Sequence, residues 1–120
     1  MPQFLLILYE NPGSFAKMSP EEIQAIIQQY GAWTQKVGAA GKLVGGRKLM
    51  DEGGKRMARA GGKLTVTDGP YAETKEVVGG IFTVRANDYR EAVEIASDCP
   101  HLQFGRMEVR QIDFMGRPED

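Results

Sequence analysis

Apolar residues recur along this chain with two different spacings, and these spacings predict which segments are extended and which are helical. Residues 4–9 form an uninterrupted apolar run, which is typical of a short strand with buried side chains on both faces. After Ser19 the apolar positions recur every three or four residues, as on one face of an amphipathic helix. We expect this helix over residues 20–40, because Ser19 and Glu22 can form a capping box and Gly41 can end the helix. Its apolar stripe comprises Ile23, Ile26, Ile27, Tyr30, Trp33, Thr34 and Val37.

Further apolar runs predict five more strands and a second helix. The glycine pair at residues 61 and 62 is expected to turn a hairpin, since glycine tolerates the positive φ that tight hairpin turns require. Asn87 is expected to cap a helix that runs to about Asp98 and ends before Pro100. The expected strands comprise residues 43–49, 55–60, 63–67, 77–84 and 106–114.

With the hairpin set aside, the order of these elements is βαββαβ, which predicts an α+β fold of the ferredoxin-like type with an extra β-hairpin. That fold lays both helices on one face of the sheet. Residues 4–9 and 81–84 offer apolar side chains to both faces, so the second face also needs a cover. A second copy of the chain is the simplest cover, and we expect a homodimer. We expect one domain over residues 1–115 and a polar tail over residues 116–120.

Composition narrows the classes of partner. The chain has 120 residues, of which 42% are hydrophobic and 26% charged, as in a globular domain with a core of its own. The formal net charge is −1 and no Lys/Arg cluster is present, which argues against direct binding of nucleic acid. The longest apolar run is too short to span a membrane, and the lone Cys99 cannot form an intrachain disulfide. We therefore expect a cytoplasmic protein.

The stretch with the most varied side-chain chemistry follows the hairpin, at residues 68–76. Its Asp-Gly-Pro start is typical of a turn, and Asp68 itself is expected to act mainly in that turn. Polar side chains in a loop on a rigid scaffold are often ligand sites, and the alternative is a solvated connection between two strands. The candidate ligand-binding residues are Asp68, Tyr71, Glu73 and Lys75, with Arg47 and His101 as outer candidates.

The same stretch, Asp-Gly-Pro-Tyr-Ala-Glu-Thr-Lys-Glu, resembles the signature of the DGPF-domain proteins, which are part of the YCII-related family. Tyr71 departs from the phenylalanine of that signature but keeps the ring. The resemblance implies a dimeric α/β barrel and, in some bacteria, an association with extracytoplasmic-function sigma factors. Better-studied YCII relatives have a histidine–aspartate pair with the histidine near the first helix, whereas residues 20–40 contain no histidine here. The resemblance also takes in residues 4–9, 19–22, 79–80, 99–100 and 107–110.

The residue types alone do not identify a catalytic group. His101, the only histidine, is either a general base near neutral pH or a histidine favoured at a helix C-terminus by the backbone dipole. Cys99 is expected to be a buried cysteine rather than a thiolate partner of His101. One His and one Cys cannot complete a structural zinc site, and no glycine motif cradles phosphate, so we expect neither metal nor cofactor. Met18, Tyr30 and Trp33 could either line a small-molecule pocket beside the sheet or form a core stripe.

These observations leave two main hypotheses about function. The first is the binding or transformation of a small organic molecule in the barrel, near residues 68–76, with proton-transfer or lyase-like chemistry implied by the resemblance. The alternative is a non-catalytic regulatory or protein-interaction module in a sigma-factor context. A third hypothesis, a dimer-forming scaffold without a ligand, predicts a barrel without a cavity.

Overall fold

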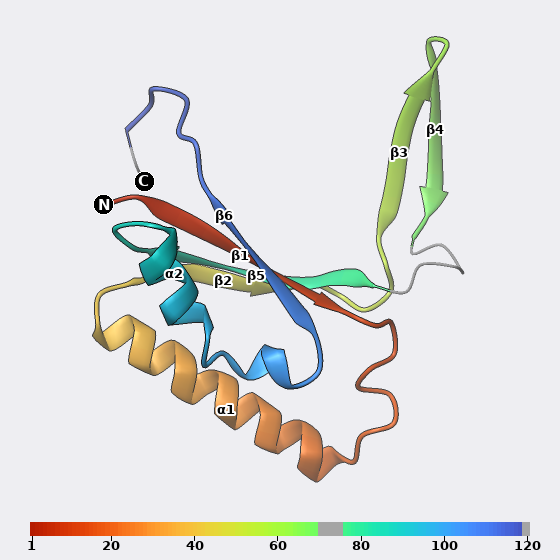
Figure 1. Ribbon diagram of the computed structural model, residues 1–120. Coiled ribbons are helices and arrows are strands. Elements are labelled where there is room, and N and C mark those ends of the chain that lie inside the picture. The colour runs from red at the N-terminus through yellow and green to blue at the C-terminus, as the bar shows by residue number, and fades with distance from the viewer. Residues whose placement is uncertain (70–75, 119–120) are drawn as a thin grey trace.

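A four-stranded antiparallel sheet with helices on one of its faces forms the body of the molecule (Figure 1). The computed structural model describes residues 1–69 and 76–118. The sheet contains β1 (Gln3–Glu10), β2 (Leu43–Lys48), β5 (Val77–Arg85) and β6 (Arg106–Gln111), in the order β2-β5-β1-β6. The helices are α1 (Pro20–Ala39) and α2 (Tyr89–Ala96), followed by the 3₁₀ turn η1 (Pro100–Gln103). This α+β arrangement is compatible with the ferredoxin-like fold expected from the order of elements.

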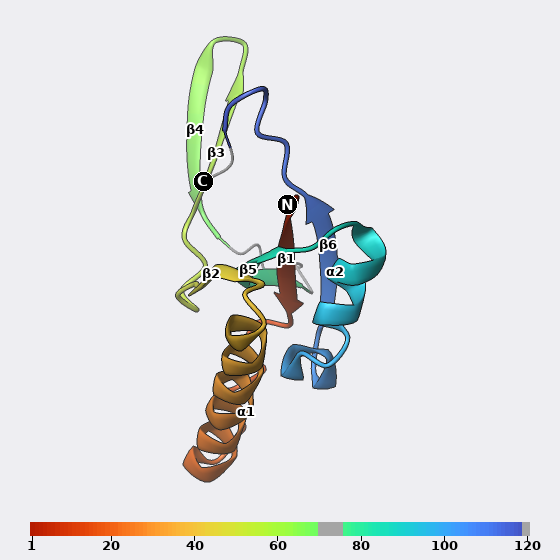
Figure 2. The same cartoon turned by 90° about the vertical axis from the view of Figure 1, so that its left-hand side faces the viewer.

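The predicted hairpin is present and forms an arm that stands away from the body (Figures 1 and 2). Its strands are β3 (Lys55–Ala60) and β4 (Lys63–Asp68), and they pair with each other rather than with the main sheet. Gly61 and Gly62 turn the hairpin with φ values of 57° and 77°, as two-residue hairpin turns require. The radius of gyration is 16.5 Å, above the roughly 14 Å of a compact chain of this length, which fits an arm outside the core.

The ends of α1 follow the predicted chemistry. Ser19 accepts a hydrogen bond from the backbone N–H of Glu22 at 3.1 Å, and the Glu22 carboxylate accepts one from the N–H of Ser19 at 3.3 Å. The capping box is therefore confirmed. Gly41 lies just beyond the helix with a φ of 73°, the left-handed conformation that commonly closes a helix. Within the described ranges, no helix has both the length and the apolar composition that a membrane crossing requires.

The hydrophobic core lies between the helices and the sheet face that they cover. Phe4 and Leu6 of β1 and Val84 of β5 are fully buried in it. Along β1 the side chains alternate between this face and the opposite one, as the pleat of a strand dictates. The other buried apolar residues of the core are Leu8, Trp33, Val37, Ala86, Ala92, Ala96 and Cys99.

Trp33 connects α1 to the sheet and to the end of α2. Its ring meets the ring of Phe82 edge to face, with the centroids 4.9 Å apart. Its indole N–H lies 3.1 Å from both the carbonyl oxygen of Ile95 and the Oδ1 atom of Asp98. Lys36, on the next turn of α1, forms an ion pair with the same Asp98 carboxylate. These contacts fix the C-terminal half of α1 against the body.

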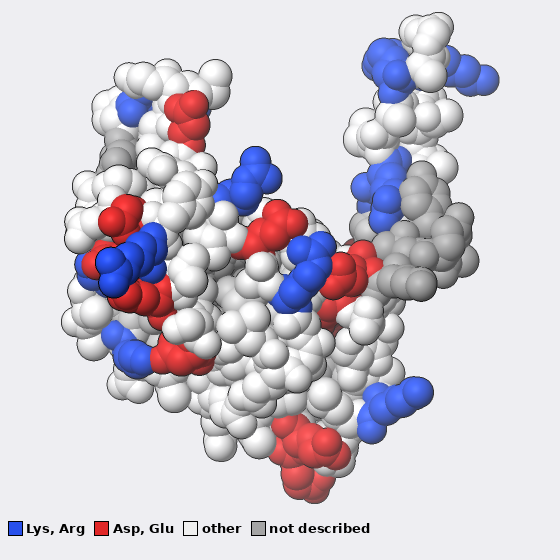
Figure 3. All heavy atoms as spheres, viewed as in Figure 1, with Lys and Arg blue, Asp and Glu red and all other residues white. Residues whose placement is uncertain are grey.

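No helix covers the second face of the sheet in the described part of the chain. Leu5, Ile7 and Tyr9 of β1 belong to this open face and are only partly buried. β6 adds charge, because the Arg106 guanidinium lies 4.0 Å from the centroid of the Tyr9 ring. The hairpin and the segment after β6 both rise on the side away from α1 (Figures 1 and 2). Figure 3 shows a hollow between them, with side chains of both charge signs exposed there.

The structure corrects three predicted boundaries. Asp88, not Asn87, caps α2, because its carboxylate accepts the N–H of Glu91 at 2.9 Å while the Glu91 carboxylate accepts the N–H of Asn87 at 2.9 Å. α2 then ends at Ala96, and η1 follows it. The last strand ends at residue 111 rather than 114, because only the N–H of Ile112, which donates to the carbonyl of Gln3, continues the contact with β1.

Candidate functional site

A cavity of about 550 Å³ lies between the N-terminal half of α1 and the sheet. That volume is within the range of small-molecule sites. The cavity exists because α1 is anchored at its other end, by Trp33 and Val37, which are 4% and 5% exposed. Ile23 and Ile26 nearer the start of the helix are only partly buried. The apolar walls include Leu8, Phe15, Ile23, Ile26 and Phe82.

Tyr30 and His101 form a buried polar pair in the wall of this cavity. The Nε2 atom of His101 lies 2.7 Å from the carbonyl oxygen of Tyr9, which can only accept, so Nε2 carries a hydrogen and donates it. In the neutral ring Nδ1 is then an acceptor, and the Tyr30 hydroxyl, 3.0 Å away, donates to it. Both ring nitrogens are therefore occupied, and His101 is 2% exposed.

Gly105 makes room for this pair. A Cβ atom at residue 105 would lie 2.2 Å from the carbonyl oxygen of Tyr9 and 2.6 Å from Nε2 of His101. Any side chain would push apart the two atoms that are joined by the hydrogen bond. Glycine is thus required where β6 begins, although its sequence context gives no sign of it.

Glu10 is the second polar group in the wall, at the end of β1. Its residue is 7% exposed, and its side chain lies across the backbone of Gly79 in β5. A Cβ atom at residue 79 would lie 1.8 Å from Oε1 of Glu10. The pairing of β1 with β5 shifts register between Leu8 and Tyr9, which leaves Gly79 as the extra residue of a bulge. The glycine in the predicted strand therefore accommodates an ionisable side chain that borders the cavity.

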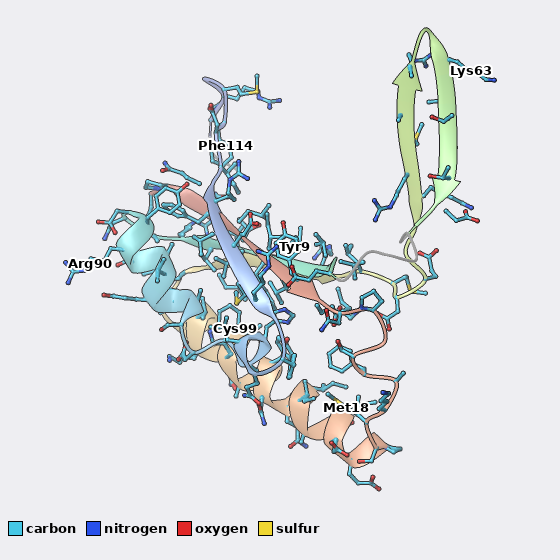
Figure 4. All side chains as sticks on the ribbon, turned by 45° about the vertical axis from the view of Figure 1, so that its right-hand side comes forward. Tyr9, Met18, Lys63, Arg90, Cys99 and Phe114 are labelled. Atoms are coloured by element: carbon cyan, nitrogen blue, oxygen red, sulfur yellow. The ribbon has the colours of Figure 1, made fainter. Side chains whose placement is uncertain are left out.

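Burial sets the acidity of two groups near this site. It raises the pKa of the Tyr30 phenol above its ordinary value, and the nearby Cys99 and Glu10 act in the same direction. Burial also raises the pKa of the Cys99 thiol, against the opposing hydrogen bond from the backbone of His101. Cys99 is 3% exposed and belongs to the core (Figure 4), as expected of a structural cysteine. Both groups are neutral at physiological pH, so neither is an activated nucleophile.

The structure brings together only some of the residues that the sequence singled out. Arg47 and His101 line the same cavity. Asp68 is not part of its lining; it ends β4 and forms an ion pair with Lys55. Tyr30 lines the cavity and Trp33 belongs to the core, whereas Met18 lies at the outer end of α1, away from the sheet (Figure 4). The candidates Tyr71, Glu73 and Lys75 lie outside the described residues.

A second and more polar hollow of about 1000 Å³ adjoins the cavity. The second is bounded by the loops at residues 11–16 and 49–54. The two linings share Glu10, Phe15, Ile23, Asp51 and Gly79. Glu76, the last residue of the signature stretch 68–76, also lines the second hollow and binds the guanidinium of Arg106 at 2.8 Å. The end of that stretch therefore borders the approach to Glu10.

Metal binding finds no ready set of ligands in residues 1–69 and 76–118. These ranges contain no group of three or more His, Cys, Asp or Glu side chains placed to hold an ion. The described lining offers a ligand apolar walls, the acceptor oxygens of Glu10 and Tyr30, and the charged side chains of Arg47, Lys48 and Asp51.

Comparison with known proteins places this chain among relatives. The model of the YCII-related domain matches residues 2–115, nearly the whole length. The chain belongs to the YCII-related family. An uncharacterized protein from Rhizobium meliloti (strain 1021) is 28% identical over 112 residues, which is 91% of this chain and 90% of that protein. The predicted family is thus confirmed, while the YCII-related relative brings no activity with it.

Replacing Tyr30 by phenylalanine tests the polar pair. We expect a loss of about 1–3 kcal/mol of unfolding free energy at pH 7, because Nδ1 of the buried His101 loses its donor. Because the folded-state pKa of Tyr30 is raised, its contribution to stability is present below the ordinary tyrosine pKa of about 10 and is lost as pH rises beyond it. The alkaline fall in stability should therefore be shallower in the variant. Urea unfolding at pH 7 to 11 measures both effects, and parallel curves above pH 10 would contradict the assignment.

Proposed function

We propose that this YCII-related protein binds a small organic molecule in the cavity between α1 and the sheet. The observation that carries the proposal is the meeting of apolar walls with the inner polar groups of Glu10, Tyr30 and His101, while Arg47, Lys48 and Asp51 line the exposed rim. Ligand sites commonly combine a mostly apolar lining with a few placed polar groups. Two glycines make room for these groups: Gly79 for the Glu10 side chain, and Gly105 for the His101 ring and the carbonyl oxygen of Tyr9.

Binding is better supported than acid–base catalysis. His101 has both ring nitrogens in hydrogen bonds, so no free nitrogen faces a ligand. The Tyr30 hydroxyl donates its hydrogen bond to His101, so it offers a ligand only the lone pairs of its oxygen as acceptors. If the protein transforms its ligand, Glu10 is the one group of this set whose oxygen atoms are not held by hydrogen bonds to described residues.

A screen by thermal shift against a metabolite library tests this proposal. A ligand present at about 100 times its Kd should add about 2.7 kcal/mol of stability. Ile26→Trp, which fills the cavity from α1, should abolish the shift, while Val93→Trp on the exposed side of α2 should leave it unchanged. Glu73→Ala with Lys75→Ala asks whether the signature loop takes part. A ligand-induced thermal shift that is unchanged in Ile26→Trp would show that the ligand does not bind in the cavity.

We also propose that two copies pair through the open sheet face in a dimeric α/β barrel. What supports this is the partly buried apolar row of Leu5 and Ile7 at the centre of that face. The hairpin and the segment after β6 flank the face and leave a hollow that a second copy can enter (Figure 3). β6 carries the opposite charges of Arg106 and Glu108. In a two-fold contact the arginine of each copy can pair with the glutamate of the other.

A second candidate function, a regulatory protein-interaction module, is favoured by the hairpin. Its strands pair only with each other, and an isolated two-stranded hairpin is marginal in water. Met57, Leu64 and Val66 are 68%, 44% and 54% exposed, and the pairing of Met57 with Val66 sets them on one face of the arm. The family resemblance suggests an extracytoplasmic-function sigma factor as the partner. Co-purification of such a factor with the wild type, and its loss with Met57→Lys, tests that assignment.

A further inference from the structure

The carboxyl group of Glu10 has an unusual environment. The residue is 7% exposed and lines the cavity. Among residues 1–69 and 76–118, no side chain or backbone group forms a hydrogen bond or an ion pair with it. No sealed side-chain oxygen among the described residues lacks a partner, so the carboxyl oxygens of Glu10 open onto the cavity that the residue lines. Buried polar groups in folded proteins are nearly always satisfied, and a donor placed in the cavity would satisfy this one. The position is built into the sheet, because Gly79 and the bulge give it space.

The neighbouring donors make other contacts, none of them to Glu10. The Tyr30 hydroxyl donates to His101, and the Nε2 hydrogen of His101 goes to the carbonyl of Tyr9. At the exposed rim of the cavity, Lys48 forms an ion pair with Asp51 at 2.9 Å, and Nη1 of Arg47 donates to the carbonyl of Gly46 at 2.7 Å. No described residue hydrogen-bonds the Glu10 carboxyl group, so a molecule in the cavity can supply its donor.

The rest of the lining fits a particular kind of donor. The rings of Phe15, Tyr30 and Phe82 border the same space as the Glu10 carboxyl group. Aromatic rings beside a carboxylate favour an ammonium group, because the ring faces and the carboxylate both attract positive charge. A ligand carboxylate would face Glu10 at close range, and a plain alcohol would supply only a neutral hydrogen bond. The aliphatic walls, Leu8 and Ile26 among them, suit an apolar body attached to the ammonium.

Resting on the ligand cavity proposed above, we propose that the occupant is an organic amine: an ammonium group that donates to Glu10, carried on an apolar body that fills the space along α1. The hydroxyl oxygen of Tyr30 is a second acceptor for the same ammonium. The site selects its ligand by the positive charge and the N–H donors of the ammonium group. The apolar walls accept apolar bodies of several shapes.

Three probes of matched size test this inference: phenethylamine, phenethyl alcohol and phenylacetate. Isothermal titration of the full chain should give an affinity for the amine about tenfold or more above that for the alcohol, with phenylacetate weakest. Glu10→Gln keeps the size of the side chain and should remove the preference for the amine without changing the affinity for the alcohol. Glu94→Gln, on the exposed side of α2, is the control and should behave as wild type.

A second variant guards against a folding defect in Glu10→Gln. Gly79→Ala leaves the glutamate in the sequence but puts a methyl group where its carboxyl group lies, so the preference for the amine should fall again. Equal affinities for amine and alcohol that are both lost in Ile26→Trp would overturn the amine assignment and leave the cavity proposal standing. Binding that Ile26→Trp does not affect, or no binding of any probe at millimolar concentration, would overturn both.

Discussion

Replacing Trp33 by alanine is expected to lower the free energy of unfolding by about 3–5 kcal/mol, the typical cost of removing a large aromatic side chain from a core. The residue is 4% exposed, so removing its ring leaves a cavity inside the core. The change also removes the contact with Phe82 and the N–H shared by Ile95 and Asp98. Chemical denaturation at one fixed protein concentration measures the loss, since association would otherwise shift the midpoint.

Trp33→Phe separates packing from hydrogen bonding. Phenylalanine keeps much of the apolar volume but loses the indole N–H, so we expect a smaller loss, of about 1–2 kcal/mol. Val93→Ala, at an exposed position of α2, is the control and should change stability by no more than about 0.5 kcal/mol. A loss below about 1 kcal/mol for Trp33→Ala would mean that α1 is held by other contacts. The cavity would then need another explanation, because its shape depends on anchoring α1 at one end only.

Elements with strong local chemistry could be predicted from the sequence. The start of α1 follows from a serine, a proline and a glutamate in adjacent positions, and its capping box is confirmed. The hairpin follows from Gly61 and Gly62, whose positive φ values are what such a turn needs. The cap of α2 was wrong by one residue, because Asn87 and Asp88 are both good caps and only the contact of Asp88 with Glu91 decides between them.

The candidate site could not be predicted in the same way, because it is made by contacts between distant segments. Tyr30 and His101 are 71 positions apart, and His101 is 92 positions from Tyr9. Glu10 is a polar residue at the end of an apolar strand, which is ordinary in a sequence. Its burial depends on a bulge opposite Gly79, so the Gly79-Gly80 pair inside a predicted strand was the one available sign.

Most of residues 68–76, which have the most varied side chains in the sequence, lie outside the described residues, so a ligand site there stays a prediction. The described cavity lies among residues whose spacing is equally typical of a core. The stripe of α1 illustrates the difficulty. Trp33 and Tyr30 have the same helical spacing, yet one fills the core and the other borders an open space. Hydrophobic periodicity identifies the face of a helix but not how far that face stands from the sheet.

Replacing Ile7 by lysine is expected to convert a dimer into a monomer. Ile7 lies at the middle of β1 on the open face and is paired with Ile81 in β5 and Glu108 in β6. In a monomer a lysine there can reach solvent and the Glu108 carboxylate, so the fold should persist. In a dimer two lysines related by the two-fold axis would be buried close together, and desolvation and repulsion would oppose association.

Sedimentation velocity at micromolar concentration measures the outcome. The wild type should sediment with twice the mass of the chain, and Ile7→Lys with the mass of one chain. Leu5→Lys, on the same face and strand, should act in the same direction, while Val93→Lys on α2 should remain dimeric. Circular dichroism of each variant checks that the fold survives. A wild type that sediments as one chain would show that the open face tolerates water, because the charged residues of β6 are then enough to solvate it.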